Sequence, residues 1–429
     1  MKALTLSYII ITSAAIVAAE YVEPYRAHPT TQCSEDSHCP VEWPCCSQYG
    51  ECGSGPLCIV GCNPKFSFSV NSCIPSPALL PKMLKKNSNG VQALSAKGDP
   101  SLLTTFKVKE SYEFTTHHEE QADYISQNEK DLNKRGLIHF PDFLITSKES
   151  VARQMLEQYD FTHSGFASID PVNNDLILGM PKKSTGSLIT STKSFLYGRA
   201  AVTLKTSRGV GVVTAIVLMS SSQDEIDFEF LGGELNMVQT NYYHQGVLDH
   251  HKMEKHHISS DSFEEFHIYE VDWDNERILW LVDGVVVRTV YKRDTWDPAK
   301  RVYRYPQTPM SLQVSVWPAG TPESAEGTVQ WAGGLVDWDN LPDIKEKGQL
   351  YATVRRISIT PYENKFWPAL VQSSYANALA GEAGNLKKPH ISYAYAPSAG
   401  FFDESSLKMY VNAVSHLAKW TSTGLNPHR

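Results

Sequence analysis

The sequence predicts a mainly β protein in which an antiparallel β-sandwich follows a small, disulfide-rich N-terminal module. Short strand-forming runs, broken by Gly, Pro, Asn and Asp, succeed one another across residues 137–365. No helical pattern separates these runs, and such spacing is typical of a sandwich and not of a parallel sheet. All eight cysteines fall in one segment near the N-terminus, and 429 residues leave room for two or three units.

The first residues predict a secretory signal peptide at residues 1–19. Lys2 precedes an apolar run at residues 4–17, and Ala18 and Ala19 supply small side chains at the expected cleavage point. A buried helix at the start of the protein is the alternative. No later stretch offers the ~20 apolar residues that span a bilayer, so we expect a soluble, secreted protein.

Residues 20–75 form the predicted cysteine-rich module. An even number of closely spaced cysteines in a secreted chain indicates a disulfide framework, whose connectivity the spacing leaves open. Zinc binding is the alternative, but the segment adds only His38 as a further ligand. The cysteines are Cys33, Cys39, Cys45, Cys46, Cys52, Cys58, Cys62 and Cys73.

A linker is predicted at residues 76–136. Pro77 and Pro81 lie at its start, and the polar segment that follows keeps neither a strand nor a helix period. Aromatic residues at 106, 112 and 114 are candidates for an extra strand on the neighbouring domain. At its end, Lys134 and Arg135 form a dibasic pair, which we interpret as a candidate cleavage site for a secretory-pathway protease.

The sandwich domain is predicted at residues 137–365 and a tail at residues 366–429. Asp283 and Gly284 separate two apolar runs, and this dipeptide strongly favours a hairpin turn. In the tail, Leu407, Val411 and Val414 recur at helical spacing and predict an amphipathic helix over residues 403–420. The nine strand-forming runs are 176–178, 200–204, 211–218, 226–230, 266–273, 278–282, 285–290, 310–316 and 352–359.

The charge balance excludes one class of partner. The formal net charge is -8, so no dense basic face is available to neutralise phosphate groups, and we expect no nucleic-acid binding. A neutral polysaccharide suits this balance better.

One strand carries three carboxylates. The segment at 224–232, DEIDFEFLG, alternates acidic and apolar residues. Successive side chains of a strand point to opposite faces, so Glu225, Asp227 and Glu229 would share one face and the apolar residues between them the other. Like charges crowded on one face repel each other, which favours a functional reason for their presence.

Glycoside chemistry supplies such a reason. One carboxylate attacks the anomeric carbon, while a second, kept protonated by its neighbours, donates a proton to the leaving oxygen. Asp227 would orient Glu225 and raise the pKa of Glu229. The backbones of Glu225 and Glu229 lie about 13 Å apart on an extended strand, so their side chains must lean together. A solvated acidic face and a calcium site are the alternatives.

At this motif the sequence resembles glycoside hydrolase family 16 and, within it, the fungal Crh-type cell-wall transglycosylases. The resemblance continues through TNYY at 240–243, HIYEVDW at 267–273, VDGVVVR at 282–288 and LQVSVWPAG at 312–320. It implies a β-jelly roll with a concave cleft, in which Glu225 is the nucleophile, Asp227 the assisting residue and Glu229 the acid/base. It also implies transfer of chitin chains to β-glucan.

Aromatic rings stack on the apolar faces of sugars, which makes several residues candidate substrate contacts. These are Tyr242, Tyr243, Trp317 and Trp331, with Arg288 and Gln313 as polar contacts by position in the resembling segments. Each aromatic residue is equally a candidate for the core, and for Trp273 and Trp280 the core is favoured. The histidines between residues 244 and 257 lie in a polar, loop-like stretch, so we expect no metal and no cofactor.

The cysteine-rich module resembles the hevein-like chitin-recognition module at CCSQYGECG, residues 45–53. That resemblance implies sugar contacts by Ser47 and Tyr49. Glu51 and Leu57 stand where the pattern commonly has aromatic residues, which predicts weak binding. A disulfide-stabilised spacer without a ligand is the alternative.

The expected partners are therefore chitin and β-glucan, bound by a monomer in the cell wall or spore wall. The polar end of the chain, residues 421–429, lacks the hydrophobic tail of a lipid-anchor signal, so we expect the non-anchored branch of the family, which has a sporulation member. Two alternatives remain: a simple endo-hydrolase of chitin or β-glucan, and a non-catalytic wall-binding protein. Whether water or a sugar hydroxyl is the acceptor depends on subsites that the sequence leaves open.

Overall fold

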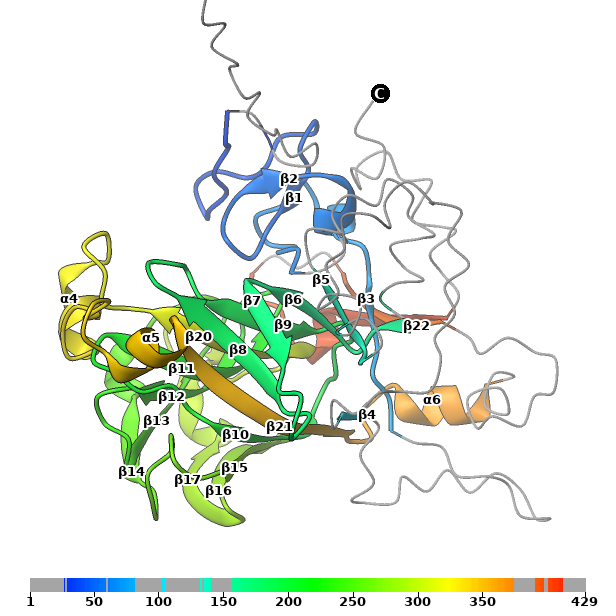
Figure 1. The fold of residues 1–429 in the computed structure, drawn as a ribbon. Coiled ribbons are helices and arrows are strands. Elements are labelled where there is room, and N and C mark those ends of the chain that lie inside the picture. The colour runs from blue at the N-terminus through cyan, green and yellow to red at the C-terminus, as the bar shows by residue number, and fades with distance from the viewer. Residues whose placement is uncertain are drawn as a thin grey trace, which may run out of the picture.

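The computed structural model describes residues 27, 29–58, 61–81, 102–104, 132, 135–139, 156, 158–373, 390–396 and 400–411. Figure 1 shows a small N-terminal module above a body built mainly of strands. The predicted signal peptide, Lys134 and the aromatic residues at 106, 112 and 114 lie outside the described residues. No helix in the described ranges is long and apolar enough to cross a membrane.

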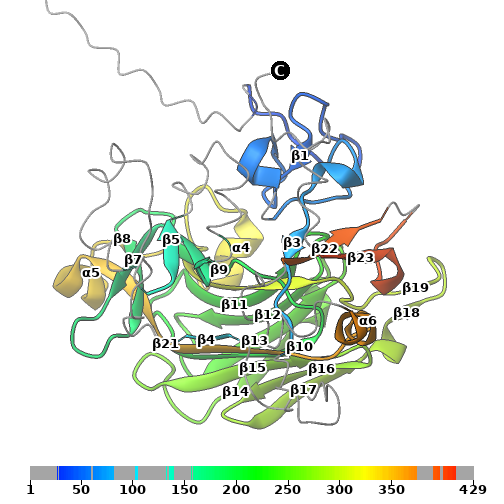
Figure 2. The same cartoon turned by 90° about the vertical axis from the view of Figure 1, so that its right-hand side faces the viewer.

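Two eight-stranded sheets form the body, which confirms the predicted β-sandwich of the jelly-roll type. The front sheet has the strand order β14-β13-β12-β11-β20-β9-β6-β5. The back sheet has the order β17-β16-β15-β10-β21-β8-β7, with β4 also paired to β21. Every pairing in both sheets is antiparallel except that of β5 with β6. In Figures 1 and 2 the strands β11 and β12 of the front sheet lie between the N-terminal module and the strands β10, β15 and β16 of the back sheet.

The strand bounds of the body are as follows. The front sheet consists of β5 (Leu137–His139), β6 (Phe161–Ser164), β9 (Ser187–Ser191), β11 (Val212–Ser220), β12 (Glu225–Leu231), β13 (Met237–Tyr243), β14 (Glu254–His257) and β20 (Met310–Pro318). The back sheet consists of β4 (Leu102–Thr104), β7 (Phe166–Ile169), β8 (Leu176–Pro181), β10 (Gly198–Lys205), β15 (His267–Trp273), β16 (Arg277–Val282), β17 (Val285–Tyr291) and β21 (Gln349–Pro361).

Shorter elements occupy the connections. The body adds η4 (His250–Lys252), η5 (Lys292–Thr295), β18 (Trp296–Asp297), β19 (Val302–Tyr303), α4 (Glu326–Trp331), α5 (Pro342–Lys347) and α6 (Trp367–Gln372). The N-terminal module contains β1 (Cys45–Cys46), β2 (Cys52–Gly53), η1 (Gly55–Cys58) and η2 (Val70–Ser72), followed by β3 (Ser76–Pro77). The C-terminal part contains β22 (Ile391–Tyr395), η6 (Glu404–Ser406) and β23 (Leu407–Val411).

Alternating burial produces the sandwich. Along β10 and β20 every second side chain is buried, as a strand with one face on a core requires. The core lies between the sheets and includes Phe228, Phe230 and Tyr269, whose rings pack against one another. All nine predicted strand-forming runs fall in strands, from β8 to β21.

The predicted Asp-Gly hairpin is also present, between β16 and β17. Val282 pairs with Val285, so Asp283 and Gly284 form a two-residue turn. Their φ angles are 50° and 80°, in the left-handed region that a type I′ turn requires and that glycine adopts without strain. The Asp283 carboxylate also accepts a hydrogen bond from the backbone N–H of Ile268 at 2.8 Å.

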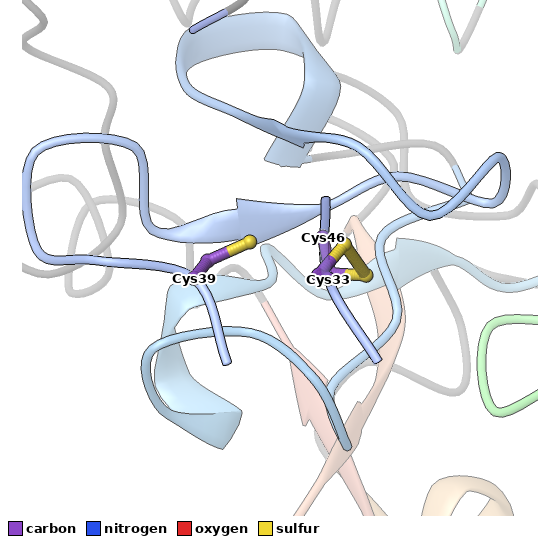
Figure 3. Close-up of side chains that lie close together, drawn as sticks. All are labelled: Cys33, Cys39 and Cys46. Atoms are coloured by element: carbon purple, nitrogen blue, oxygen red, sulfur yellow. A yellow bond between two sulfur atoms is a disulfide. The ribbon is translucent and has the colours of Figure 1, made fainter. Parts of the chain in front are cut away.

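Four disulfides hold the cysteine-rich module, which confirms the predicted framework. The pairs are Cys33–Cys46, Cys39–Cys52, Cys45–Cys58 and Cys62–Cys73. Figure 3 shows three sulfurs, those of Cys33, Cys39 and Cys46, close together. Each is bound to another sulfur, so this cluster offers no thiolate to a metal ion.

The C-terminal part corrects one prediction. Residues 403–411, expected to begin a helix, form the single turn η6 and the strand β23, while the rest of the predicted helix lies outside the described residues. Strand β23 pairs with β22, and β22 pairs with β3 next to the cysteine-rich module. The short helix of the tail is α6, which lies before this hairpin. The two ends of the described chain therefore meet in one small sheet (Figure 2).

Candidate active site

The three acids lie on β12, near the middle of the front sheet. Ile226, Phe228 and Phe230 are at most 2% exposed and point between the two sheets. The alternation of the strand then directs Glu225, Asp227 and Glu229 to the opposite face. We call this outer side of the front sheet the acid face. The predicted arrangement, with all three acids on one face over an apolar backing, is confirmed.

Asp227 lies at the centre of the trio and is buried. Burial and the charges of Glu225 and Glu229 raise the pKa of Asp227 well above its ordinary value, while Asp227 and Glu225 share a hydrogen bond. Burial also raises the pKa of Glu225, and the hydrogen bond opposes that rise. The hydrogen bond raises the pKa of Asp227 and lowers that of Glu225, so it favours a proton on Asp227 and the ionised form of Glu225.

Glu229 keeps its proton up to a higher pH than an ordinary glutamate. Burial raises its pKa to about 7, and the negative charge of Glu225 adds to the rise. We expected Asp227 to cause this shift, but the causes are burial and Glu225. A protonated Asp227 carries no charge to act on Glu229. The trio thus contains one carboxylate suited to attack and one carboxylic acid suited to donate a proton.

Two groups behind the strand fix its position. The Trp280 indole N–H donates to the backbone carbonyl of Asp227 at 2.9 Å. Asp224, fully buried at the start of the strand, accepts hydrogen bonds from the backbone N–H groups of Gln245 and Gln307 and from the Thr308 hydroxyl, at 2.7–3.1 Å. Asp224 therefore joins the loops after β13 and before β20 to the start of β12. Both Trp280 and Trp273 are fully buried, as predicted.

Strand β13 adds further polar groups to the acid face. Tyr243, Asn241 and Gln239 lie directly opposite Glu225, Asp227 and Glu229, respectively. Residues directly opposite each other in a sheet point to the same face. The Asn241 amide donates to the Tyr243 hydroxyl at 2.9 Å. Burial raises the pKa of Tyr243, and the three acids raise it further, which places its ring among them.

The predicted Trp317, Trp331 and Gln313 also belong to this face. Trp317 and Gln313 lie on β20 in register with Val213 and Val217 of β11, which in turn pair with Leu231 and Asp227. Trp331, at the end of α4, stacks on Trp317 with ring centroids 6.2 Å apart. Its indole N–H donates to the Gln239 amide oxygen at 2.8 Å. The pair offers aromatic surface beside Glu229, as stacking on a sugar requires.

This geometry agrees with comparisons to known proteins. The model for glycosyl hydrolases family 16 matches residues 155–333, which include all three acids. The chain is 58% identical over 422 residues to the protein named "Probable glycosidase CRR1" of Eremothecium gossypii, across 97% of this chain and 93% of that relative. The chain belongs to glycosyl hydrolase family 16. As a member of family 16, it is a glycoside hydrolase or transglycosylase.

Further relatives extend this family 16 assignment. "Probable glycosidase CRR1" of Saccharomyces cerevisiae is 44% identical over 403 residues, 94% of each chain. "Crh-like protein UTR2" of Candida albicans is 37% identical over 337 residues, 79% of this chain and 60% of that one. Among solved structures, "Crh5 transglycosylase in complex with NAG" aligns with a TM-score of 0.47 and 28% identity, over 58% of this chain and 88% of that chain.

Two predicted substrate contacts of this family 16 enzyme need correction. Tyr242 belongs to the core cluster between the sheets, because its neighbours in the strand, Asn241 and Tyr243, occupy the acid face. Arg288 is also buried and lies over the rings of Tyr242 and Trp280. Its guanidinium donates to the backbone carbonyls of Thr240 and Lys252 at 2.8 and 2.6 Å. Arg288 therefore supports β13 from behind, and neither side chain faces the acids.

The histidines after β13 form no metal centre with one another in the described chain, where the cysteine sulfurs are the one group close enough for shared ligation. His244 is buried, and burial lowers its pKa to about 4. His256 contacts the Thr240 hydroxyl at 3.0 Å, and His250 lies 3.4 Å from the Tyr243 hydroxyl. These histidines therefore make local contacts in β14 and in the segment between β13 and β14.

In the cysteine-rich module, the two predicted sugar contacts differ in exposure. Tyr49 is 60% exposed, whereas Ser47 is 8% exposed. The Ser47 hydroxyl accepts the backbone N–H groups of Tyr49 and Glu51, both at 3.3 Å. Ser47 thus stabilises the turn, and Tyr49 presents an open ring.

Sequence reasoning missed Gln239 and Asn241. A usable signal was present, because residues two and four positions before Tyr243 on the same strand must share its face. Gln239 has a buried amide N–H group, next to Glu229, that no atom of the described residues accepts. A buried donor without a partner is costly, and a bound sugar hydroxyl is a suitable acceptor for it.

Proposed function

We propose that this family 16 enzyme is a retaining glycosidase and transglycosylase that acts on β-linked cell-wall polysaccharide. Glu225 is the nucleophile, Glu229 the acid/base, and Asp227 the residue that positions Glu225. One observation carries the proposal: three acids share one strand face, Asp227 is hydrogen-bonded to Glu225, and burial with the charge of Glu225 raises the pKa of Glu229 to about 7. Such a division of roles is what a double displacement needs.

In the first step a Glu225 oxygen attacks the anomeric carbon of the bound sugar. The bond from that carbon to the glycosidic oxygen breaks, and this oxygen takes the proton of Glu229. The products are a glycosyl ester on Glu225 and a free chain end. In the second step the ionised Glu229 removes a proton from an incoming hydroxyl group, whose oxygen displaces Glu225. Two inversions at the anomeric carbon retain its configuration.

Asp227 acts through Glu225. While Glu225 is ionised, the hydrogen bond from Asp227 orients it and spreads its negative charge. As the ester forms, the charge on Glu225 disappears, and that hydrogen bond weakens. Asp227 also contacts the backing of the strand, because its own carbonyl accepts the Trp280 indole N–H. The position of the nucleophile is therefore set by the core.

We further propose chitin as the donor and β-glucan as the acceptor, in the cell wall or spore wall. The support is the resemblance of four sequence segments to Crh-type transglycosylases and the similarity of the chain to relatives named glycosidase and Crh-like protein. The four disulfides fit an oxidising, secreted environment. The exposed ring of Tyr49 suits the hevein-like module as a weak chitin anchor.

Replacement of Glu225 by Gln tests the proposed function. We expect the variant to lose both hydrolysis and transfer of labelled chito-oligosaccharides, because an amide cannot form the glycosyl ester, while binding of the same oligosaccharides persists. Separation of hydrolysed from joined products with the wild-type enzyme then distinguishes a hydrolase from a transglycosylase. Activity of Glu225→Gln close to wild type would reject the assignment.

A further inference from the structure

We propose that the cysteine-rich module forms a wall at one side of the acid face, and that Gln48 of this module acts with Gln313 to bind the last sugar residue of a chain lying there. This inference rests on the proposed function, because it assigns a subsite to that same site. The ligand class is a neutral, β-linked oligosaccharide. The module would then limit how many sugar residues the enzyme holds on this side of the acids.

The contact between the two glutamines places the module beside the acids. The Gln313 side-chain amide donates to the Gln48 amide oxygen at 3.2 Å. Gln313 is in register with Val217, and Val217 with Asp227. Two strand spacings, about 10 Å, therefore separate Gln313 from Asp227 across the sheet. Figure 1 shows the module above the part of the front sheet that contains β9 and β20.

A crevice lies between the module and the sheet at this point. Its floor includes Met219, which is in register with Glu225 on the neighbouring strand, so the crevice begins one strand away from the nucleophile. Beyond Met219 the lining consists mostly of hydroxyl and amide groups and contains no charged side chain. The polar members are Gln48, Ser76, Thr190, Ser191, Thr192, Ser194, Ser220, Ser221, Ser311 and Gln313.

The neutral amides of Gln48 and Gln313, beside the crevice, suit the end of a sugar chain better than a charged ligand. Neutral donors and acceptors pair with sugar hydroxyl or acetamido groups, whereas a charged ligand would find no partner. The Gln48 amide accepts from Gln313 and has N–H donors of its own. The free space of the whole crevice is little more than that of a water molecule, so no sugar residue fits inside it. A polysaccharide therefore meets Gln48 as an end wall, because no room remains for its next residue.

The wall is fixed in place by backbone contacts. Directly after the module, the Ser194 N–H donates to the Pro77 carbonyl, and the Leu79 N–H donates to the Ser194 carbonyl, at 2.9 and 2.8 Å. Strand β3 pairs with β22 of the C-terminal hairpin. On the module side, Lys65 lies over the ring of Phe401 from the segment that precedes β23. The module is therefore docked on both sides of the crevice.

Gly61 sets the position of the Gln48 side chain. A Cβ atom at Gly61 would lie 3.2–3.4 Å from the Gln48 side chain, and the φ of Gly61 is +66°. The absence of a side chain at Gly61 lets Gln48 lie flat against the backbone and extend toward Gln313. The loop that carries Gln48 lies between Cys46 and Cys52, and disulfides hold both of these cysteines.

Two substitutions of opposite effect at Gln48 test the proposal on the full-length enzyme. We expect Gln48→Ala to shift the products of a labelled chito-oligosaccharide ladder toward one more sugar residue on the walled side, and Gln48→Trp to shift them toward one fewer. Loss of the amide contact in Gln48→Ala should raise KM for the shortest good substrate about three- to tenfold, as one or two hydrogen bonds would, with kcat nearly unchanged.

Three controls keep the test specific. Glu42→Ala, at an exposed site of the same module, should leave the products as in the wild type. Gln313→Ala, on the sheet itself, should reproduce the KM rise of Gln48→Ala, and the double variant should add little to it. Melting temperatures identify any variant in which the module has loosened. In that case the KM of Gln313→Ala decides, because this substitution lies on the sheet and not in the module.

The outcomes separate the two proposals. If the wild type is active but the product pattern and KM stay unchanged in Gln48→Ala, Gln48→Trp and Gln313→Ala, the wall is refuted and the proposed function stands. If the wild type neither cleaves nor joins any β-linked oligosaccharide, the proposed function fails and the wall fails with it.

Discussion

At the scale of single residues, burial and neighbouring charge shift the pKa values of three similar carboxyl groups to different extents, which supports the different roles proposed for them. Asp227 is the most enclosed, and burial together with the charges of Glu225 and Glu229 raises its pKa well above the ordinary value. Glu229 titrates at about 7 because it is buried beside the charge of Glu225. The roles thus follow from position on one strand, since all three groups have similar pKa values in water.

The raised pKa of Glu229 predicts the alkaline limb of the activity profile. The proton-donating form exists below the pKa and disappears as the pH rises through about 7, so kcat/KM should fall above that pH. Glu229→Gln should lose this limb and reduce the rate on ordinary oligosaccharides about 10²- to 10⁴-fold. With a glycosyl fluoride, whose leaving group needs no proton, the variant should release fluoride in a rapid first step.

The rate on an ordinary oligosaccharide, measured against pH in both proteins, checks the alkaline limb, and fluoride release from the glycosyl fluoride checks the first step. An alkaline limb that persists unchanged in Glu229→Gln would assign it to another group. A slow first step with the fluoride would show that Glu229 is not the acid.

The shared face of the three acids was predictable from the sequence, because strand alternation alone determines it. The same rule separates Tyr242 from Tyr243, since adjacent residues of a strand cannot both face a substrate. The role of Arg288 had no local signal, because its partners Thr240 and Lys252 come from distant segments. The contact of Gln48 with Gln313 spans 265 positions and was equally hidden.

At the scale of elements, the short strand-forming runs and the residues of the turns predicted the sandwich well. The Asp283-Gly284 turn and nine strand runs follow from local sequence. The error in the tail has a physical reason. Leu407 and Val411 suit a helix at spacing four, but with Met409 they also alternate at period two. Pairing with β22 selects the strand.

Two glycines with positive φ should respond differently to alanine. At Gly284 a Cβ would meet no atom within 4 Å, so Gly284→Ala should cost only the left-handed backbone penalty, about 1–2 kcal/mol. At Gly186 a Cβ would lie 1.9 Å from the carbonyl oxygen of Val316, so Gly186→Ala must separate the start of β9 from β20. We expect a loss above about 4 kcal/mol in this case.

Denaturant unfolding of both variants measures these losses. Equal destabilisation would mean that the close approach of β9 to β20 is absent in solution. Since Gly186 lies beside Trp317, Gly186→Ala should also lower activity, whereas Gly284→Ala should not.

At the scale of the whole molecule, the segment after the cysteine-rich module and the C-terminal hairpin meet beside the candidate active site. The sequence indicated a separate module, a linker and a tail. In the structure, β3 after the module pairs with the C-terminal hairpin, and β4 pairs with β21 of the back sheet. These pairings join segments far apart in the sequence and were not predictable from local pattern. The hairpin reaches the active-site loops through Gln245.

Gln245 provides a test of this closure. Its side-chain amide accepts the backbone N–H of Phe402 at 3.0 Å and donates to the carbonyl of the same residue. Gln245→Asn tolerates the positive φ of this position but is too short to reach Phe402. We expect a loss of about 1–3 kcal/mol in unfolding free energy, as for two broken buried hydrogen bonds, and faster proteolysis of the C-terminal hairpin.

The matched control is Gln330→Asn, at an exposed site on α4, which should change stability by less than about 0.5 kcal/mol. If Gln245→Asn and Gln330→Asn behave alike, the hairpin does not stabilise the loops at the active site.

The central claim is that Glu225 forms a covalent bond with the sugar while Glu229 handles the proton. Incubation of Glu229→Gln with a chito-oligosaccharide glycosyl fluoride should trap the ester, because no base remains to activate the acceptor. Peptide mapping by mass spectrometry should then find the sugar on Glu225. A trapped sugar on another residue, or rapid turnover to a product of inverted configuration without any adduct, would contradict the account.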